Sequence, residues 1–599
     1  MKRLGLFLVG ILLLCATSCD CPDCGVAKFS IDTKIFLVTK HADGSQTCAP
    51  EAIKFTTSYE WTASNSAPKY IDFSTTEGTG GVFHFPVRLT SEFFETFRTN
   101  PGQFTIDAIG CRVGRIEFVS SGGERLVATI YLKDAMVLCF DTNGGQGRVP
   151  EPMGFVAGEE VTLPGNTTGM TYSSKSFVGW GTMADGSGVF YDDGSKAIFG
   201  SSILLYALWE GDGSSADGPK YIYNRRTLME VNNDPSLHYL VVADFDANED
   251  EENGVYYPSW KPIRTFTGAL NGNNHHIQYT IEATSTNQVG REYYGLFSVL
   301  GDDAAVGLVK DLTVSGSIKV NSQTIIVCGG IAGSLFRGSI TRCLSEVELN
   351  TEKTVTGMGM NPFSGGIVGD SYNGNIEYCV FTGSIRNTTA NGSLGQLYTG
   401  GIVGYNFASS IRYCISTGPI SGEALVSADF GDAYTGGIAG VNQGTIQYCA
   451  SSSLVTGKGE VVESGGIVGM HGVAGASVSY SVALNKGMTA GSPAIIAVKT
   501  TDAAVSHQFW LGRIVGMSDA LATMSNNYAL SDMYVQRFTD PIGTVAGGMA
   551  TNKNGEDIAV GNAGNQSWWT GIGWSGTHWD FSTLSSLGVP WPQDTPKPE

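Results

Sequence analysis

One short acidic segment has the residue types and the spacing to hold a metal ion. Its four oxygen donors stand at alternate positions of the chain: Asp244, Asp246, Asn248 and Asp250. Calcium loops space their ligands in this way because a hard cation prefers several carboxylate and amide oxygens. The segment departs from that pattern, since Glu249 replaces the usual glycine and Val255 replaces the bidentate glutamate. We therefore predict either a Ca²⁺ site or a solvated acidic loop here, and we expect no other cofactor.

A ladder of cysteines in the second half of the chain is the next candidate for chemistry. Its members recur at intervals of 36, 35 and 35 residues: Cys343, Cys379, Cys414 and Cys449. A thiolate metal site needs convergent ligands, and no histidine recurs at a matching interval. Side chains that point the same way from neighbouring strands are also poorly placed for disulfides. We interpret these cysteines as small apolar residues that fill an interior.

Recognisable catalytic motifs are absent from the sequence. The patterns G-x-S-x-G, H-E-x-x-H and G-x-x-x-x-G-K-[ST] do not occur. Cys21 and Cys24 form a C-x-x-C pair, but no second pair stands at zinc spacing. Outside the cytoplasm these cysteines could form a disulfide with each other or with Cys48 or Cys111. We predict no catalytic residues in this chain.

A repeat that spans the second half of the chain must position these side chains. Gly-Gly-Ile triplets begin at Gly329, Gly365, Gly400 and Gly436, so the period is 35 or 36 residues. Self-similarity at this period indicates a solenoid, in which strands stack at ~4.8 Å and bond to the next repeat. We expect each repeat to hold a Gly-Gly-Ile strand, a polar turn, a strand leading to the cysteine and a strand ending in glycine. Parallel crossovers favour right-handed winding.

The repeats resemble the GLUG motif, a family that implies a β-helix-like stack on secreted bacterial proteins. The segment Phe266–His275 is similar to a signature that often precedes such arrays. A group of tryptophans follows the last repeat: Trp568, Trp569, Trp574, Trp579 and Trp591. We interpret them as a cap over the exposed strand edge rather than as a sugar-binding platform. Residues 219–599 are therefore predicted to form a right-handed parallel β-helix (solenoid) with a Trp-rich cap.

The N-terminal residues indicate export. A basic start, an apolar run from Leu4 to Leu14 and small residues before Cys19 are typical of a signal peptide over residues 1–18. The segment resembles a bacterial lipoprotein signal, which implies lipid at Cys19 as the membrane anchor and a tether over residues 19–27. Asp20 resembles export signals for the outer face of the outer membrane. A soluble secreted protein is the alternative.

An immunoglobulin-like β-sandwich is expected over residues 28–134. Short alternating strands separated by turn signals predict it, and no helical period competes over most of the segment. The order of Trp61, Gly78-Thr79-Gly80-Gly81 and a Gly-Arg-Ile strand starting at Gly114 resembles BACON-type domains, and fimbrillin-like sandwiches are the competing resemblance.

A small β-grasp-like module is expected over residues 137–209. Its motifs include Phe140-Asp141-Thr142-Asn143-Gly144-Gly145 and Leu205-Tyr206-Ala207-Leu208-Trp209, and they resemble a Listeria–Bacteroides repeat, a module of surface adhesins. Trp180 and Trp209 are expected to fill its core, and Asn143-Gly144-Gly145 to form a turn with positive φ. Residues 210–218 read as a flexible linker.

Composition and charge limit the function. The formal charge of −20 repels phosphate backbones, so we expect no nucleic-acid partner. We predict an all-β cell-surface lipoprotein of the outer membrane that acts as a non-enzymatic adhesin or recognition protein for host or matrix glycans or proteins. The alternatives are a β-helix carbohydrate-active enzyme, such as a polysaccharide lyase or glycosidase, and a structural surface spacer. The sequence does not specify the ligand-binding residues.

Overall fold

A computed structural model describes most of the chain. The described residues are 29–41, 43–250, 254–286, 290–354, 362–389, 395–424, 431–486, 493–499, 508–537, 543–544, 549 and 551–598. The predicted signal peptide, the tether and Cys19 lie outside them, as does the side chain of Asp250. Strands account for 53% of the chain and helices for 7%, which confirms the all-β prediction. No helix of the described part is long and apolar enough to cross a membrane.

The chain divides into two compact units. The first comprises Met1–Phe140, Pro150–Leu163 and Ser195–Leu204, and the second comprises the remaining segments, including Leu205–Glu599. Residues 137–209, predicted as one module, therefore contribute to both units.

A β-sandwich forms most of the first unit. One sheet contains β1 (Phe29–Ile31), β4 (Ala52–Thr57) and β8 (Gly81–Pro86). The other contains β2 (Ile35–Lys40), β3 (Gln46–Ala49), β5 (Trp61–Asn65), β7 (Glu77–Gly78), β10 (Thr105–Asp107), β11 (Gly110–Ser120) and β12 (Arg125–Leu132). The two layers meet at stacked rings, since the centroids of Phe55 and Phe118 are 4.6 Å apart and Trp61 lies against both. The predicted sandwich is confirmed.

Helix α1 (Ser91–Thr99) interrupts this all-β unit and was not predicted. Thr90 caps its first turn by accepting a hydrogen bond from the Phe93 amide. Phe93 and Phe97 are spaced by one helical turn and are both buried, so the helix covers one end of the core. That spacing was the signal in the sequence.

Residues 137–209, predicted as a β-grasp-like module, contain antiparallel strand pairs. In the first unit β15 (Glu160–Thr162) pairs with β18 (Lys196–Ile198), and in the second β16 (Ser176–Gly181) pairs with β17 (Phe190–Asp192). Trp180 and Trp209 are buried, and their indole N–H groups donate to the carbonyls of Pro164 and Thr142. Asn143 and Gly144 have φ of 48° and 82°, which confirms the predicted turn.

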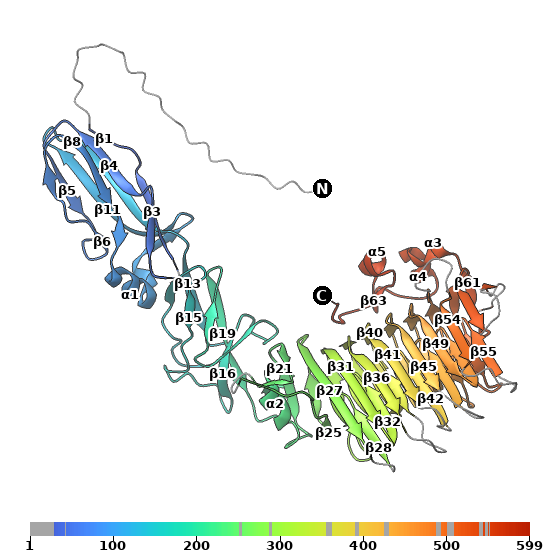
Figure 1. Cartoon of the computed structure of the whole chain (residues 1–599). Helices are drawn as coiled ribbons and strands as arrows, with labels where there is room; N and C mark the ends of the chain where they lie inside the picture. The colour runs from blue at the N-terminus through green and yellow to red at the C-terminus, as the bar shows by residue number, and fades with distance from the viewer. Residues whose placement is uncertain are drawn as a thin grey trace. The chain divides into compact units, whose positions relative to one another are not determined.

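A parallel β-solenoid of about six turns dominates the second unit (Figure 1). Its strands form three sheets, here called A, B and C. Sheet A includes β20 (Lys220–Ile222), β21 (His238–Val241), β26 (Ala269–Asn271), β30 (Leu308–Lys310), β33 (Ala332–Phe336), β38 (Val368–Tyr372), β43 (Val403–Arg412), β47 (Ala439–Gln447), β51 (Val468–His471) and β56 (Val515–Ser518). Sheet B includes β22 (Phe245–Asp246), β27 (His276–Ser285), β31 (Thr313–Ser322), β36 (Glu348–Lys353), β40 (Val380–Phe381), β41 (Ser384–Thr389), β44 (Ile415–Ser416), β45 (Ile420–Ala424), β48 (Ala450–Ser451) and β49 (Val455–Gly459). Sheet C consists of β28 (Arg291–Tyr294), β32 (Ile325–Gly329), β37 (Phe363–Gly365), β42 (Gly395–Gly400), β46 (Gly431–Gly436), β50 (Val461–Gly465) and β55 (Gln508–Gly512).

Each repeat of 35 or 36 residues makes one turn of the solenoid. Val380 pairs with Ile415, and Ile415 pairs with Ala450, in successive strands of sheet B. The cysteines that precede these residues are fully buried and free, so the prediction that they fill the interior is confirmed.

The Gly-Gly-Ile triplets form corners, and the predicted Gly-Gly-Ile strand is wrong. Strand β32 ends at Gly329, Gly330 and Ile331 form a bend, and β33 starts the next sheet at Ala332. The physical reason is close approach of neighbouring turns. A Cβ on Gly366 would lie 2.2 Å from both the Gly401 carbonyl oxygen and the Phe381 ring.

The C-terminal segment lies along one flank of the solenoid (Figure 1). It contains α3 (Val560–Ala563), α4 (Gln566–Gly571), β62 (Trp579–Asp580), α5 (Leu584–Leu587) and β63 (Trp591–Pro592). It covers a ladder of tyrosine rings from successive turns, whose centroids are 4.8, 5.5 and 4.8 Å apart: Tyr378, Tyr413, Tyr448 and Tyr480. The Trp574 indole donates to the Tyr480 carbonyl, and Thr595 donates to the Tyr378 carbonyl. The tryptophans were predicted to cap the last strand edge of the solenoid. In the structure they contact the tyrosine ladder along this flank, over several turns.

Candidate functional site

The acidic segment predicted to bind calcium is tied into the first turns of the solenoid. One carboxylate oxygen of Asp244 accepts hydrogen bonds from the His275 ring (2.8 Å) and from the His276 amide (2.9 Å). The bond from His275 is the main cause that lowers the pKa of Asp244. Asp246 accepts from the Asn248 amide and from the Gln278 side chain. Both carboxylates therefore already join neighbouring strands.

Asn248 is fully buried, and its side chain is hydrogen-bonded to the backbone of two other segments. Its carboxamide donates to the carbonyls of Tyr257 and Thr280 and accepts from the Thr280 amide at 2.6 Å. Among the described residues no group of three or more His, Cys, Asp and Glu side chains could hold a metal ion. With the Asp250 side chain outside those residues, the calcium site stays a prediction.

An aromatic surface with embedded carboxyl groups lies where sheets A and C face each other. We call it the aromatic seam and define it by these residues: Arg291, Tyr293, Phe363, Asp370, Tyr372, Gln396, Tyr398, Tyr405, Phe407, Asp432, Tyr434 and Glu463. The register places one member above another, since Phe363 pairs with Tyr398 and Tyr398 with Tyr434. Glycines at each corner bring the two sheets close together, and the rings fill the space beyond them.

Ring packing gives the seam a rigid wall. The rings of Phe363, Tyr398 and Tyr434 stack with centroids 4.9 and 5.4 Å apart. Tyr405 reaches across from sheet A and meets Tyr398 at 5.6 Å and Phe363 at 5.9 Å. Such contacts fix the rings in place, because tilted and offset arrangements are favoured between aromatic side chains.

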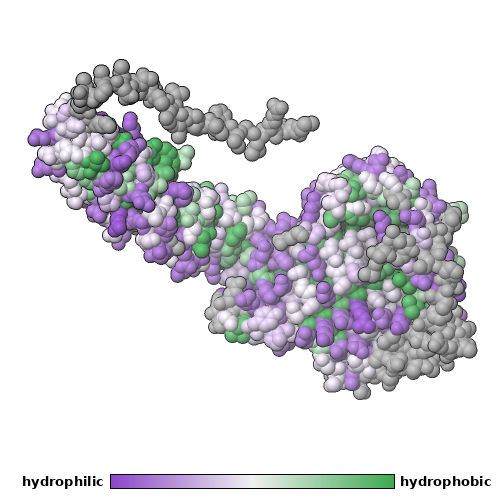
Figure 2. Space-filling model, turned by 45° about the horizontal axis from the view of Figure 1, so that its top comes forward, coloured by the Kyte–Doolittle hydropathy of each residue, from purple (hydrophilic) through white to green (hydrophobic). Residues whose placement is uncertain are grey.

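The outer edge of the seam is open to solvent. Phe407 is 42% exposed, and its ring lies 5.8 Å from that of Tyr372, one turn away. Tyr372 and Tyr405 are half-buried. On the side turned to the viewer, Figure 2 shows the solenoid as mostly hydrophilic with smaller hydrophobic areas. An exposed phenylalanine beside tyrosines is therefore a local feature of a polar molecule.

Asp370 is the buried polar centre of the seam. Its Oδ2 accepts a hydrogen bond from Arg291 at 3.0 Å, while its Oδ1 has no hydrogen-bond partner among the described residues. Burial raises the pKa of Asp370 to about 6, against the opposing effects of Ser334 and Arg291. The Arg291 guanidinium also lies over the Phe363 ring, at 5.3 Å from its centroid.

Two further carboxyl groups, those of Asp432 and Glu463, lie in later turns of the solenoid. Burial, with a contribution from Asp432, raises the pKa of Glu463 to about 8. Burial also raises the pKa of Asp432, although the Tyr434 hydroxyl and the Gln396 amide donate to its carboxylate. The seam thus combines flat rings with three carboxyl groups whose pKa values are raised by burial.

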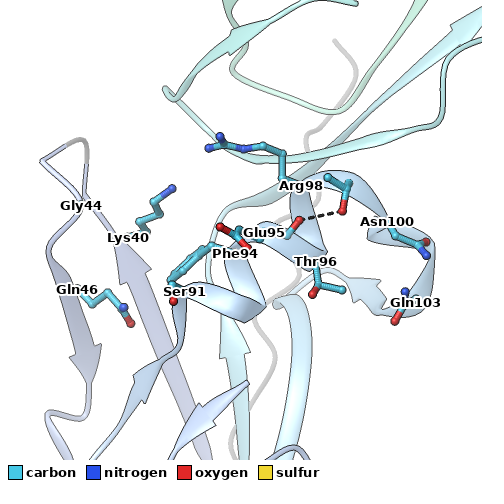
Figure 3. A pocket seen from close by; sticks show the side chains of 11 residues that line it. Lys40, Gly44, Gln46, Ser91, Phe94, Glu95, Thr96, Arg98, Asn100 and Gln103 are labelled. Carbon is cyan, nitrogen blue, oxygen red and sulfur yellow. Dashed lines mark hydrogen bonds between the residues drawn. The ribbon is translucent and has the colours of Figure 1, made fainter. Parts of the chain in front are cut away.

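A separate open pocket lies in the first unit, beside helix α1 (Figure 3). Lys40 and Gln46 lie across it from the helix, which carries Phe94 and Arg98. Lys40 and Arg98 both pair with Glu159, at 3.0 and 2.5 Å. Because Lys40 and Arg98 are already in ion pairs with Glu159, the pocket offers no strong concentration of unpaired charge to a ligand.

A family model for a short repeat motif matches one turn of the solenoid. Residues 395–421 match the family of the GLUG motif, and they cover β42, the next corner and the strands that lead past Cys414. One crystal structure, from Bacteroides ovatus, is described as a "putative immunoglobulin A1 protease"; it is 17% identical, with a TM-score of 0.37, and covers 64% of this chain and 94% of its own. No curated protein matches the chain significantly. The motif and the β-helix fold fit a surface protein.

The seam was missed at the level of sequence, although a signal was present. Phe363, Tyr398 and Tyr434 each stand two residues before a Gly-Gly pair, and Tyr372 and Phe407 each stand five residues after the isoleucine. Recurrence of aromatics at two fixed positions of the repeat predicts stacked rings on a solenoid. The burial of Asp370 had no such signal.

Proposed function

We propose that this chain is a non-enzymatic recognition protein of the bacterial cell surface, and that its aromatic seam binds host or matrix glycans. The observation that carries the proposal is the exposed edge of the seam, where Phe407 and Tyr372 lie beside Arg291, an exposed residue that pairs with the buried Asp370. In this proposal Cys19 carries the lipid that anchors the chain to the outer membrane.

The chemistry of the seam suits the ring of a sugar, which carries hydroxyl groups. Tyrosine offers a flat apolar face with a polar tip, and tyrosine and arginine are enriched where interfaces gain most of their affinity. Asp370 is fully buried and accepts a hydrogen bond from Arg291, so it holds the Arg291 guanidinium in place beside the rings. Since similar rings recur at each turn, a chain of sugars would gain affinity from several weak contacts.

The Asp432–Glu463 pair supports a rival proposal, that the solenoid is a carbohydrate-active enzyme. Glycosidases use two carboxyl groups, one of them with a raised pKa, and burial raises the pKa of both Asp432 and Glu463. Asp370 is not part of such a pair. It lies three turns from Glu463, about 14 Å along the stack at ~4.8 Å per strand.

Glycan arrays with the chain from residue 20 onward would test the proposal, with binding and product release followed together. Saturable binding without product is expected. The double variant Tyr372→Ala/Phe407→Ala should weaken binding at least about tenfold, because two ring contacts are lost. Tyr256→Ala is the matched control, since Tyr256 is 61% exposed and lies outside the seam.

Two results would overturn the recognition proposal. Released product that disappears in Glu463→Gln would favour the enzyme. Full binding by the double variant would remove the seam from the interaction. The anchor is tested separately, because Cys19→Ala should release the chain from membranes into the soluble fraction without changing glycan binding.

A further inference from the structure

A second pocket lies at the start of the solenoid, within the larger compact unit. Its floor is the outer face of sheet A, where β21, β26 and β30 pair in parallel register. Tyr239, Leu270 and Val309 are buried in the core, so their neighbours along each strand face outward. The floor therefore presents two rows of side chains: His238, Ala269 and Leu308 in one, and Leu240, Asn271 and Lys310 in the other.

A folded loop forms the wall of this pocket. Residues 210–218 were predicted to be a flexible linker, but the Gly211 amide donates to the Pro219 carbonyl and the Gly213 amide to the Gly218 carbonyl. Lys175 closes the wall by donating from its ammonium to the Asp217 carbonyl at 2.6 Å. The pocket is partly open to solvent, and its volume of about 420 Å³ is within the range of small-molecule sites.

The charge in this pocket is opposite to that of the chain. The chain carries a formal charge of −20, yet the lining has Lys175 and Lys310 against the single carboxylate of Asp217. Lys310 lies 3.3 Å from Asp311, and an ammonium group has three donors, so one ion pair leaves capacity for a ligand. An anion in the pocket would meet one lysine in the wall and one on the floor.

We propose that this pocket binds an acidic monosaccharide, a pyranose ring that bears a carboxylate. The carboxylate pairs with Lys175 and Lys310, the C–H face of the ring rests on Leu240 and Leu308, and the hydroxyl groups bond with Asn271. Burial raises the pKa of Tyr221, also in the lining, to about 12, so its phenol stays neutral and adds no competing charge. The site is distinct from the aromatic seam and does not depend on the function proposed for it.

Calorimetric titration of the chain from residue 20 onward would test this site, with glucuronate and N-acetylneuraminate as the two acidic probes and glucose as the neutral one. Saturable binding of at least one acidic sugar is expected, with weaker binding at high salt. Lys310→Met should weaken it about tenfold or more, because a charge-assisted hydrogen bond is lost. Lys319→Met is the matched control, since Lys319 is an exposed lysine of strand β31.

Leu308→Trp tests the pocket without changing its charge. Leu308 is 40% exposed on the floor, so a larger side chain fills the space above the strands and should abolish binding. Failure of both acidic sugars to bind would overturn the proposal, as would equal affinity for glucose or full binding by Lys310→Met. Loss of acidic-sugar binding in the seam variant Tyr372→Ala/Phe407→Ala would place the ligand in the seam, and that result would also overturn it.

Discussion

The carboxyl group of Glu463 is buried, and this environment disfavours its charged form. Burial is the main cause that raises its pKa from 4.5 to about 8. The folded state therefore binds this proton more tightly than the unfolded chain, and the contribution of Glu463 to the unfolding free energy falls as pH rises from about 4 to 8. Glu463→Gln keeps the group neutral. At pH 8.5 the variant should be more stable than the parent chain by about 2–4 kcal/mol, while the two should differ little at pH 4.

Denaturant unfolding followed by tryptophan fluorescence at both pH values measures this difference. Glu348→Gln is the control, because Glu348 is an exposed residue of strand β36. An unchanged pH dependence in Glu463→Gln would show that another group is responsible.

Cys414 shows how one position of the repeat accepts different residues. Its Sγ lies 3.1 Å from the Arg412 carbonyl, and Ser481 fills the equivalent position of a later turn by donating to the Ser479 carbonyl at the same distance. Cys414→Ser should therefore cost at most about 1 kcal/mol. Cys414→Leu should cost about 1–3 kcal/mol, because it overfills the interior. Equal midpoints of thermal unfolding for the two variants would contradict this account.

At the scale of the element, the glycine corners determine how the strands stack. Gly366→Ala would place a methyl group 2.2 Å from the Gly401 carbonyl oxygen and the Phe381 ring, so we expect destabilisation of about 2–4 kcal/mol. Gly561→Ala is the matched control, because Gly561 lies in helix α3 with nothing within 4 Å of the added group. The control should be neutral or stabilising by up to about 1 kcal/mol. Equal stability of the two variants, measured by chemical denaturation, would show that the corners tolerate side chains.

The elements that the sequence predicted best are those that repeat. The period of the Gly-Gly-Ile triplets predicted the solenoid, and the cysteine ladder predicted its interior, because each observation recurs in every turn. Single elements carry no such redundancy. The sequence signal for helix α1 is the spacing of Phe93 and Phe97. The loop after Glu210 is held by backbone hydrogen bonds, which its content of glycine and serine does not reveal.

At the scale of the whole molecule, contacts between distant segments were beyond sequence reasoning. Tyr378 and His578 are 200 residues apart, yet the tyrosine hydroxyl and the histidine ring are 2.6 Å apart. The tryptophans were interpreted as an end cap rather than as a sugar-binding platform, and only their contacts with the tyrosine ladder show that they cover a flank of the solenoid. The same limit applied to the pocket at the start of the solenoid, whose wall and floor come from segments far apart in the chain.

The flank cover leads to a prediction for the whole chain. A chain ending at Ile558 would expose the stacked rings of Tyr378, Tyr413, Tyr448 and Tyr480, which the C-terminal segment contacts through Trp574 and Trp579. Four buried tryptophans would also be lost from the core. We therefore expect stronger binding of an apolar dye and a lower unfolding temperature, because a continuous apolar strip meets water. Trp568→Ala in the full chain is the control, since Trp568 is only partly buried. Unchanged dye binding by the shortened chain would show that the tyrosine ladder is stable without its cover.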